Sequence, residues 1–328
     1  MKKCVICKTE LTWENSTICI KCGADICEEC SIKYKFKCNK CADVQKIKIP
    51  DVIRRSSIED YKACPYYFKL HVIDGNEPKQ SVLARLGSDL HELYEQVQRG
   101  DVEPILTELM LQTDWIIANI EEDYPDEDKD KLWERAEICN RNFINLYPTL
   151  KNKPIAFEER IEFPVGKDLP KITIAYDRLE EDENGDLHVI DWKTGKVMSG
   201  KKLTTDLQPA LYLKAVQQKY GKMPKSFRLI YLSDTYKDGT YKERIFTSLD
   251  DNRFGCTVGN KVYIQNIDEQ IKVVQQLFSR IKAGKFSIPD KPDYFKCKMC
   301  DFREKGLCSG SDVENWKLIN KEREAYGW

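Results

Sequence analysis

Residues Leu187 to Gly195 read L-H-V-I-D-W-K-T-G, where an apolar strand ends in an acid and a lysine two positions apart. Successive side chains of a strand point to opposite faces, so Asp191 and Lys193 leave the same face. A carboxylate beside an ammonium on one strand can hold a divalent cation and orient a nearby water. D-x-K alone is common and usually marks a solvated ion pair, so the surrounding sequence must decide.

A second acid comes earlier in the chain, because Ile172 to Tyr176 reads as a strand that leads into Asp177 and Arg178. The connection to the next strand contains Asn184-Gly185, a hairpin signal. A two-residue turn would put Asp177 and Asp191 on different faces. A three-residue loop, 183–185, would set them opposite each other, with Gly185 in the left-handed conformation. A shared metal requires an odd-length loop, and this is the prediction.

This order, D-R after one strand and I-D-x-K-T-G in the next, resembles the RecB-type branch of the PD-(D/E)XK nucleases, which includes CRISPR-associated exonucleases and AddB-like proteins. The resemblance implies an α/β fold with a restriction-endonuclease-like core, a mixed sheet flanked by helices. It also implies metal-dependent cleavage of DNA phosphodiesters. The stretch 56–68, S-S-I-E-D-Y-K-A-C-P-Y-Y-F, is similar to the opening of such a domain.

Two helical motifs extend the resemblance. In a helix predicted over 81–99, Gly87 and His91 lie one turn apart. The glycine allows close backbone approach, and the histidine can reach an ion as a neutral imidazole. In a later helix, Gln208 and Tyr212 match the family's Q-x-x-x-Y motif, where an amide and a phenol could hold the phosphate backbone or brace the lysine.

The resemblance implies roles for these residues. His91, Asp177, Asp191 and the carbonyl of Trp192 would hold Mg²⁺ or Mn²⁺. Lys193 would orient the attacking water and stabilise charge on the phosphoryl oxygens. In the alternating strand 156–163, Glu158 either completes the metal site or is a solvated charge. His71 and His188 lack such context and are interpreted as structural.

Composition limits the architecture. The chain has 328 residues, 41% of them hydrophobic, which suits a small module followed by one large domain. The expected boundary places a double zinc finger at 1–46 and the nuclease domain at 47–328, with a linker near 47–55. No apolar run reaches membrane-spanning length and no signal peptide is evident, which favours a reducing, cytoplasmic setting. The net charge of −1 says little about partners, since a nuclease channel needs only a local basic stripe.

The cysteines are numerous, fourteen in total, and twelve have metal-ligand spacing. Four C-x2-C pairs precede residue 45, enough to hold two Zn²⁺ ions tetrahedrally. Their separations resemble the cross-brace of RING and FYVE fingers, which would join the first pair to the third and the second to the fourth. The two resulting ligand sets are Cys4, Cys7, Cys27 and Cys30, and then Cys19, Cys22, Cys38 and Cys41.

The finger lacks the histidine features of lipid-binding FYVE domains and ubiquitin-ligase RING domains, because no histidine precedes His71. The favoured interpretation is a finger that docks DNA or a protein, or that caps the nuclease.

A second cysteine group ends the chain, Cys297-x2-Cys300-x7-Cys308. Cys64 stands in the C-P context that RecB-type domains with iron–sulfur clusters use. The resemblance therefore implies a [4Fe-4S] cluster on these four residues, with zinc as the alternative. Cys139, in a helical pattern, and Cys256, in a loop-like stretch, are interpreted as ordinary thiols.

The predicted function is a DNA exonuclease. No G-x-x-x-x-G-K-[ST] motor motif occurs, so single strands, frayed ends or duplex opened by a partner such as a helicase are the expected substrates. The competing interpretation is a non-catalytic, metal-rich adaptor in a DNA-processing complex. The remaining pattern predicts helices at 105–119, 131–147 and 261–283, and strands at 227–232 and 241–247, with Pro65 dividing the first helix.

Overall fold

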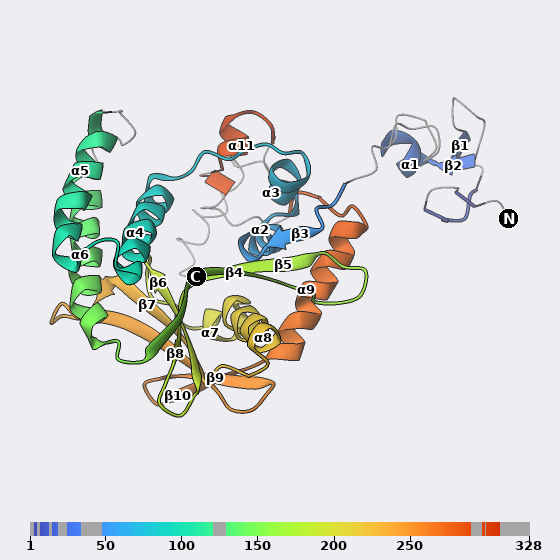
Figure 1. The fold of residues 1–328 in the computed structure, drawn as a ribbon. Helices are drawn as coiled ribbons and strands as arrows, with labels where there is room; N and C mark the ends of the chain where they lie inside the picture. Colours follow the sequence, from blue (N-terminus) through green and yellow to red (C-terminus); the bar gives the residue numbers. More distant parts are fainter. Residues whose placement is uncertain are drawn as a thin grey trace. The chain divides into compact units, whose positions relative to one another are not determined.

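The computed structural model describes residues 3–4, 7–12, 15–18, 25–33, 48–120, 129–289, 297–298 and 300–308 (Figure 1). The chain divides into two compact units, Met1–Ile49 and Pro50–Trp328. Among the described helices, none has both the length and the apolar character needed to cross a membrane.

The first unit contains short elements. Strands β1 (Ser16–Ile18) and β2 (Asp25–Cys27) pair antiparallel, and helix α1 (Glu28–Lys33) follows directly. Such short elements bury little apolar surface by themselves. The buried side chains in the described part of this unit are three cysteines and one isoleucine: Cys4, Ile26, Cys27 and Cys30.

The second unit is built on an eight-stranded mixed sheet, with strand order β10-β9-β8-β7-β6-β5-β3 and β4 paired with β5. The pairs β6–β7 and β3–β5 are parallel, and the other pairs are antiparallel. The strands are β3 (Val52–Arg54), β4 (Lys153–Phe163), β5 (Lys171–Glu181), β6 (Leu187–Lys193), β7 (Ser226–Thr235), β8 (Tyr241–Ser248), β9 (Arg253–Val258) and β10 (Lys261–Asn266).

Strand β5 forks away from β6. Its last residues, Arg178 to Glu181, pair with β6, whereas its first residues, Lys171 to Thr173, pair with β3. Strand β4 pairs with β5 along nearly its full length, so β3 and β6 share the opposite edge. Asp177 lies where β5 and β6 begin to part.

Helices cover this sheet on both faces (Figure 1). In one group, α4 and α6 pack on β6 and β7 through Leu90, Tyr94, Phe143, Trp192 and Ile230, all fully buried. Helix α8 contacts β4, β5 and β7, and also packs against α9. The helices are α2 (Arg55–Ala63), α3 (Pro65–Phe68), α4 (Val82–Arg99), α5 (Thr107–Ile120), α6 (Lys129–Leu146), α7 (Lys202–Thr205), α8 (Gln208–Tyr220), α9 (Ile267–Lys282) and α11 (Asp301–Glu304).

The predicted fold class, a mixed α/β sheet flanked by helices, is confirmed. Pro65 divides the first helix as predicted, since α2 ends at Ala63 and the Cys64 thiol accepts a hydrogen bond from the Tyr67 amide at the start of α3. The helix predicted over 81–99 is α4, capped by the Ser81 hydroxyl.

Three local predictions were wrong. The expected capping box at 56–59 is absent, because α2 begins at Arg55 without a side-chain cap. The first six residues of the helix predicted over 261–283 form strand β10, since Val262, Tyr263 and Ile264 favour a strand, and Asn266 then caps α9. Cys256 lies buried in β9 and not in a loop. In addition, the stretch interpreted as a linker contains β3.

Candidate metal and catalytic site

The hairpin between β5 and β6 has the predicted odd-length loop. The amide of Asp182 donates to the carbonyl of Asp186 at 2.9 Å, and Gly185 has a φ of +76°. In this register Arg178 pairs with Ile190. The next position along both strands therefore sets Asp177 opposite Asp191. The turn chemistry therefore brings both acids to the fork between the strands.

Asp177 is fixed from two sides. One carboxylate oxygen accepts a hydrogen bond from the backbone amide of Trp192, and the other lies 3.0 Å from Nδ1 of His91. The helix that carries His91 approaches the loop after β6 closely, since a Cβ on Gly87 would lie 3.1 Å from Oγ1 of Thr194. This is the close approach that the G-x-x-x-H motif predicts.

Glu158 joins His91 and Asp177, with one ligand atom from each residue lying within 4.8 Å of the others. The pairs Phe157–Arg178 and Glu159–Tyr176 flank Glu158, so it lies directly across the ladder from Asp177. Its buried Oε1 makes no hydrogen bond in the described part of the chain and lies 3.9 Å from Nδ1 of His91. A buried carboxylate oxygen that makes no hydrogen bond and lies beside an imidazole fits the role of a cation ligand.

The electrostatics of this group are those of crowded acids. Burial raises the pKa of Asp177, and the nearby carboxylates of Asp191 and Glu158 raise it further against the opposing effect of His91. Burial disfavours the charged imidazole, but Asp177, Glu158 and Asp191 outweigh it and raise the pKa of His91. The protonated imidazole of His91 thus supplies positive charge that balances the carboxylates. A bound divalent ion would take over this role.

Asp191 and Lys193 form the second part of the site. The Lys193 ammonium contacts Oδ2 of Asp191, and the side-chain amide of Gln208 donates to Oδ1 at 3.0 Å. Gln208 begins α8 and is buried with Tyr212, one turn later on the same helix. Burial and the nearby Asp191 carboxylate raise the pKa of Tyr212 well above its ordinary value, so its phenol keeps its proton.

The loop after β6 is braced by α6 and β7. The carbonyl of Thr194 accepts hydrogen bonds from Arg135 at 3.0 Å and from the hydroxyl of Ser233 at 2.7 Å. Three residues on, the amide of Val197 donates to Asp234 at 2.8 Å. These bonds hold the chain immediately after Lys193, which restricts where the lysine can go.

In the first unit, four of the predicted zinc ligands converge. The sulfurs of Cys4, Cys7, Cys27 and Cys30 lie within 4.8 Å of one another, and those of Cys7 and Cys27 are 3.6 Å apart. Tetrahedral coordination with a Zn–S bond of about 2.3 Å requires sulfurs roughly 3.8 Å apart, so this set fits a single ion. The other predicted ligands, Cys19, Cys22, Cys38 and Cys41, lie outside the described residues.

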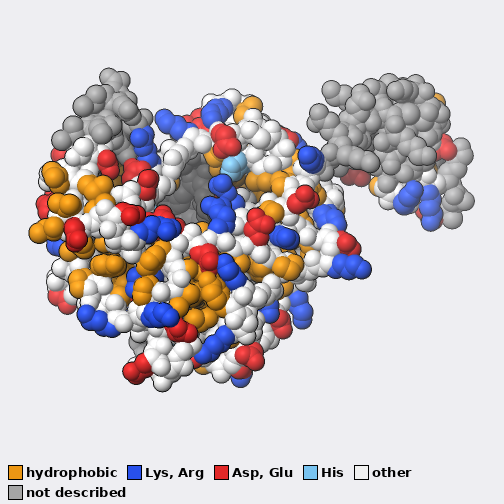
Figure 2. All heavy atoms as spheres, viewed as in Figure 1, with side chains coloured by type: hydrophobic (Ala, Val, Ile, Leu, Met, Phe, Trp, Pro, Cys, Tyr) orange, Lys and Arg blue, Asp and Glu red, His pale blue; other side chains and the backbone are white. Residues whose placement is uncertain are grey.

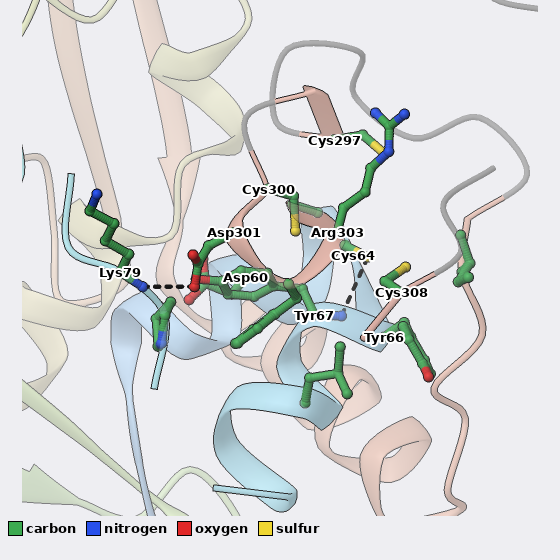
Figure 3. Close-up of a pocket in the computed structure, with 15 residues that line it drawn as sticks. Asp60, Cys64, Tyr66, Tyr67, Lys79, Cys297, Cys300, Asp301, Arg303 and Cys308 are labelled. Carbon is green, nitrogen blue, oxygen red and sulfur yellow. Dashed lines mark hydrogen bonds between the residues drawn. The ribbon is translucent and has the colours of Figure 1, made fainter. Parts of the chain in front are cut away.

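In the second unit, Cys64, Cys297, Cys300 and Cys308 line one cavity of about 310 Å³ (Figure 3). Within the described residues, no three of these sulfurs lie within 4.8 Å of one another, unlike the first set. Burial raises the pKa of both Cys64 and Cys297, which a bound cationic group would counteract.

Two features of the site were not predicted. One is the central place of Glu158, which the sequence left open between a ligand and a solvated charge. The other is the pairing of Gln208 with Asp191, where the sequence suggested a partner for phosphate or for Lys193. Both depend on contacts between segments far apart in the chain. The two other histidines have structural partners, His188 between Asp182 and Ser226, and His71 beside Glu77.

Comparison with known proteins identifies the family of this chain. Residues 55–305 match the family described as the PD-(D/E)XK nuclease superfamily, whose members are generally hydrolases that use divalent metals. A solved structure titled "Crystal structure of SSO0001" aligns with 80% of this chain and 87% of its own, at 15% identity and a TM-score of 0.34. A search of curated proteins found no match. Because the family match spans most of the sequence, the chain belongs to the PD-(D/E)XK nuclease superfamily.

Proposed function

We propose that this protein is a Mg²⁺- or Mn²⁺-dependent deoxyribonuclease that acts as an exonuclease on single-stranded or opened DNA ends. The observation that carries the proposal is the meeting of His91, Glu158 and Asp177 at the fork of the sheet, beside the ion pair of Asp191 and Lys193. An adaptor has no need of so many charged groups at one buried point, because each must be stripped of water.

The donor set suits a hard divalent ion, since it offers several carboxylate oxygens and one imidazole nitrogen. His91, Asp177, Asp191 and the carbonyl of Trp192 are the proposed ligands, and Oε1 of Glu158, which makes no hydrogen bond in the described part of the chain, adds a fifth. When bound, the ion would polarise the phosphoryl oxygen and lower the pKa of a coordinated water.

Lys193 is the proposed partner of the attacking water. Its ammonium lies against Asp191 at the rim of the acid group and is partly exposed, with 29% of the side chain accessible. From there it can orient a water and stabilise negative charge that grows on the phosphoryl oxygens. Gln208 holds the other oxygen of Asp191, so it fixes the carboxylate that the lysine contacts. Tyr212 remains a neutral donor behind it.

DNA is the proposed substrate because the superfamily consists of nucleases and the surface offers cationic groups. Figure 2 shows Lys and Arg side chains spread over this face of the molecule, several of them near the middle of the view. Single strands, frayed ends or duplex opened by a partner such as a helicase are the expected forms. The two cysteine sets would hold Zn²⁺ in the first unit and a [4Fe-4S] cluster in the second.

A cleavage assay tests the proposal. End-labelled single- and double-stranded DNA is incubated with the full chain in Mg²⁺, Mn²⁺ or chelator, and the products are resolved on a gel. Stepwise shortening that requires the metal is expected, with at least 100-fold loss in Lys193→Ala and Asp177→Ala. Binding of DNA without metal-dependent cutting would instead identify an adaptor. Iron content and a brown colour after anaerobic purification test the proposed cluster.

A further inference from the structure

Strand β4 carries two adjacent glutamates with different surroundings. Glu158 lies beside His91 and Asp177, and its Oε1 makes no hydrogen bond in the described part of the chain. Glu159 has both oxygens engaged. Its Oε1 accepts from the Lys219 ammonium at 2.5 Å, and its Oε2 accepts from the Tyr220 hydroxyl at 2.8 Å and also from the Tyr176 hydroxyl. Glu159 is therefore not available as a metal ligand. Its role must come from the side chains that it binds, which are Tyr176, Lys219 and Tyr220.

The backbone at Glu158 is strained. Its φ is +45°, in the left-handed region that residues with a Cβ rarely adopt. Such a conformation persists only where the surrounding structure fixes it, and it is found mostly at functional sites. Phe157 and Glu159, on either side, keep their ladder positions opposite Arg178 and Tyr176. The strain is thus confined to the one residue that reaches the acid group.

Both neighbours of Glu158 are fixed by side-chain contacts. The ring of Phe157 lies under the Arg178 guanidinium, 5.3 Å from its centre, and that arginine is itself paired with buried Glu180 at 2.7 Å. Glu159 is held by three donors, from β5 and from the C-terminal end of α8. The hydrogen bonds of Glu159, unlike the contact between Phe157 and Arg178, reach helix α8. The same helix contacts Asp191 through Gln208.

Helix α8 connects the two acid positions. Its first residue, Gln208, binds Asp191, and its last two, Lys219 and Tyr220, bind Glu159. The helix has thirteen residues, so these ends are about 18 Å apart along its axis. Helix α8 thereby holds Asp191 at its first residue and β4, the strand that bears Glu158, at its last two residues.

We propose that Glu159 is a positioning residue, which ties β4 to Tyr176 and to the end of α8 so that Glu158 keeps its carboxylate beside His91 and Asp177. This inference rests on the proposed metal site. A cluster that only stabilised the fold would leave metal affinity unchanged when weakened. A positioning cluster lowers metal affinity when weakened, and does so only while Glu158 has its carboxylate.

The test is a double-mutant cycle on Mn²⁺ binding, measured by titration calorimetry of the full chain. The amide of Glu159→Gln cannot accept from Lys219 while its oxygen faces the tyrosines. We expect the Mn²⁺ dissociation constant to rise about tenfold in Glu159→Gln and in Glu158→Gln. In the double variant, Glu159→Gln should add less than a twofold change, because it acts through Glu158. Glu162→Gln, an exposed glutamate of the same strand, is the matched control and should bind normally.

Tyr220→Phe provides a milder variant that removes one of the three donors, and a smaller rise in the dissociation constant is expected. If Glu159→Gln and Tyr220→Phe bind Mn²⁺ as the wild type does while Glu158→Gln binds weakly, the positioning role is wrong and the metal site stands. An undiminished Glu159→Gln effect in the Glu158→Gln background also overturns it. If Glu158→Gln binds normally, Glu158 is no ligand and the positioning role is wrong. If the wild type binds no Mn²⁺, the proposed metal site itself fails.

Discussion

The left-handed backbone at Glu158 predicts an inverted preference between alanine and glycine. Glu158→Ala and Glu158→Gly remove the same carboxylate, so they differ only in the Cβ that strains the backbone at a φ of +45°. Left-handed geometry costs a residue with a Cβ about 1–2 kcal/mol, and glycine loses roughly 0.5–1 kcal/mol through its freer unfolded chain. Glu158→Gly should therefore be about 0.5–1 kcal/mol more stable than Glu158→Ala.

The same pair at Glu162 supplies the control. Glu162 is exposed, pairs with Thr173 in the same strand and is not among the left-handed residues. There alanine should be more stable than glycine by about 0.5–1 kcal/mol.

Thermal unfolding followed by circular dichroism, without added divalent metal, measures both pairs. About 2–4 °C in Tm is expected per kcal/mol for a unit of this size, so Glu158→Gly should melt about 1–4 °C above Glu158→Ala. Equal melting temperatures at position 158, or the same order at both positions, would refute the assignment of strain to Glu158.

Three further outcomes are expected. Gly87→Ala should lower Tm and cleavage, because the new Cβ would meet Oγ1 of Thr194 at 3.1 Å, and Thr194→Ala in that background should restore Tm. Cys64→Ser should lose bound iron by mass spectrometry, whereas Cys139→Ser, with its thiol buried in α6, should retain it. Hydrogen bonds from two lysines hold the pKa of Asp186 at about 2, below its ordinary 3.8. Its stabilisation is thus present above pH 3.8 and lost towards pH 2, so Tm should fall less steeply over that interval in Asp186→Asn.

The sequence predicted the features that depend on local chemistry. Asn184-Gly185 determines the turn, the turn determines the register, and the register brings Asp177 opposite Asp191. The G-x-x-x-H spacing likewise predicted a close approach, and a Cβ on Gly87 would lie only 3.1 Å from Oγ1 of Thr194. In each case a few residues close together in the sequence are enough for the prediction.

Features that depend on distant segments escaped prediction. Glu158 looks like any charge in an alternating strand, and the strand's own residues reveal neither its left-handed φ nor the bonds that Glu159 makes with α8. Lys219 and Tyr220 read as an ordinary helix end until the fold brings them to β4. Residues 261–266 were predicted as the start of a helix, but they pair with β9 as a strand.

The cavity lined by Cys64 and by Cys297, Cys300 and Cys308 has a consequence for biosynthesis. Cys64 is translated before most of the sheet. Cys297, Cys300 and Cys308 are translated only after all of its strands. Any inorganic group held by all four sulfurs must be delivered after the strands of the sheet have been translated. Nascent chains that stop short of Cys297 contain Cys64 without the other three cysteines, so premature termination yields a product that lacks this cavity.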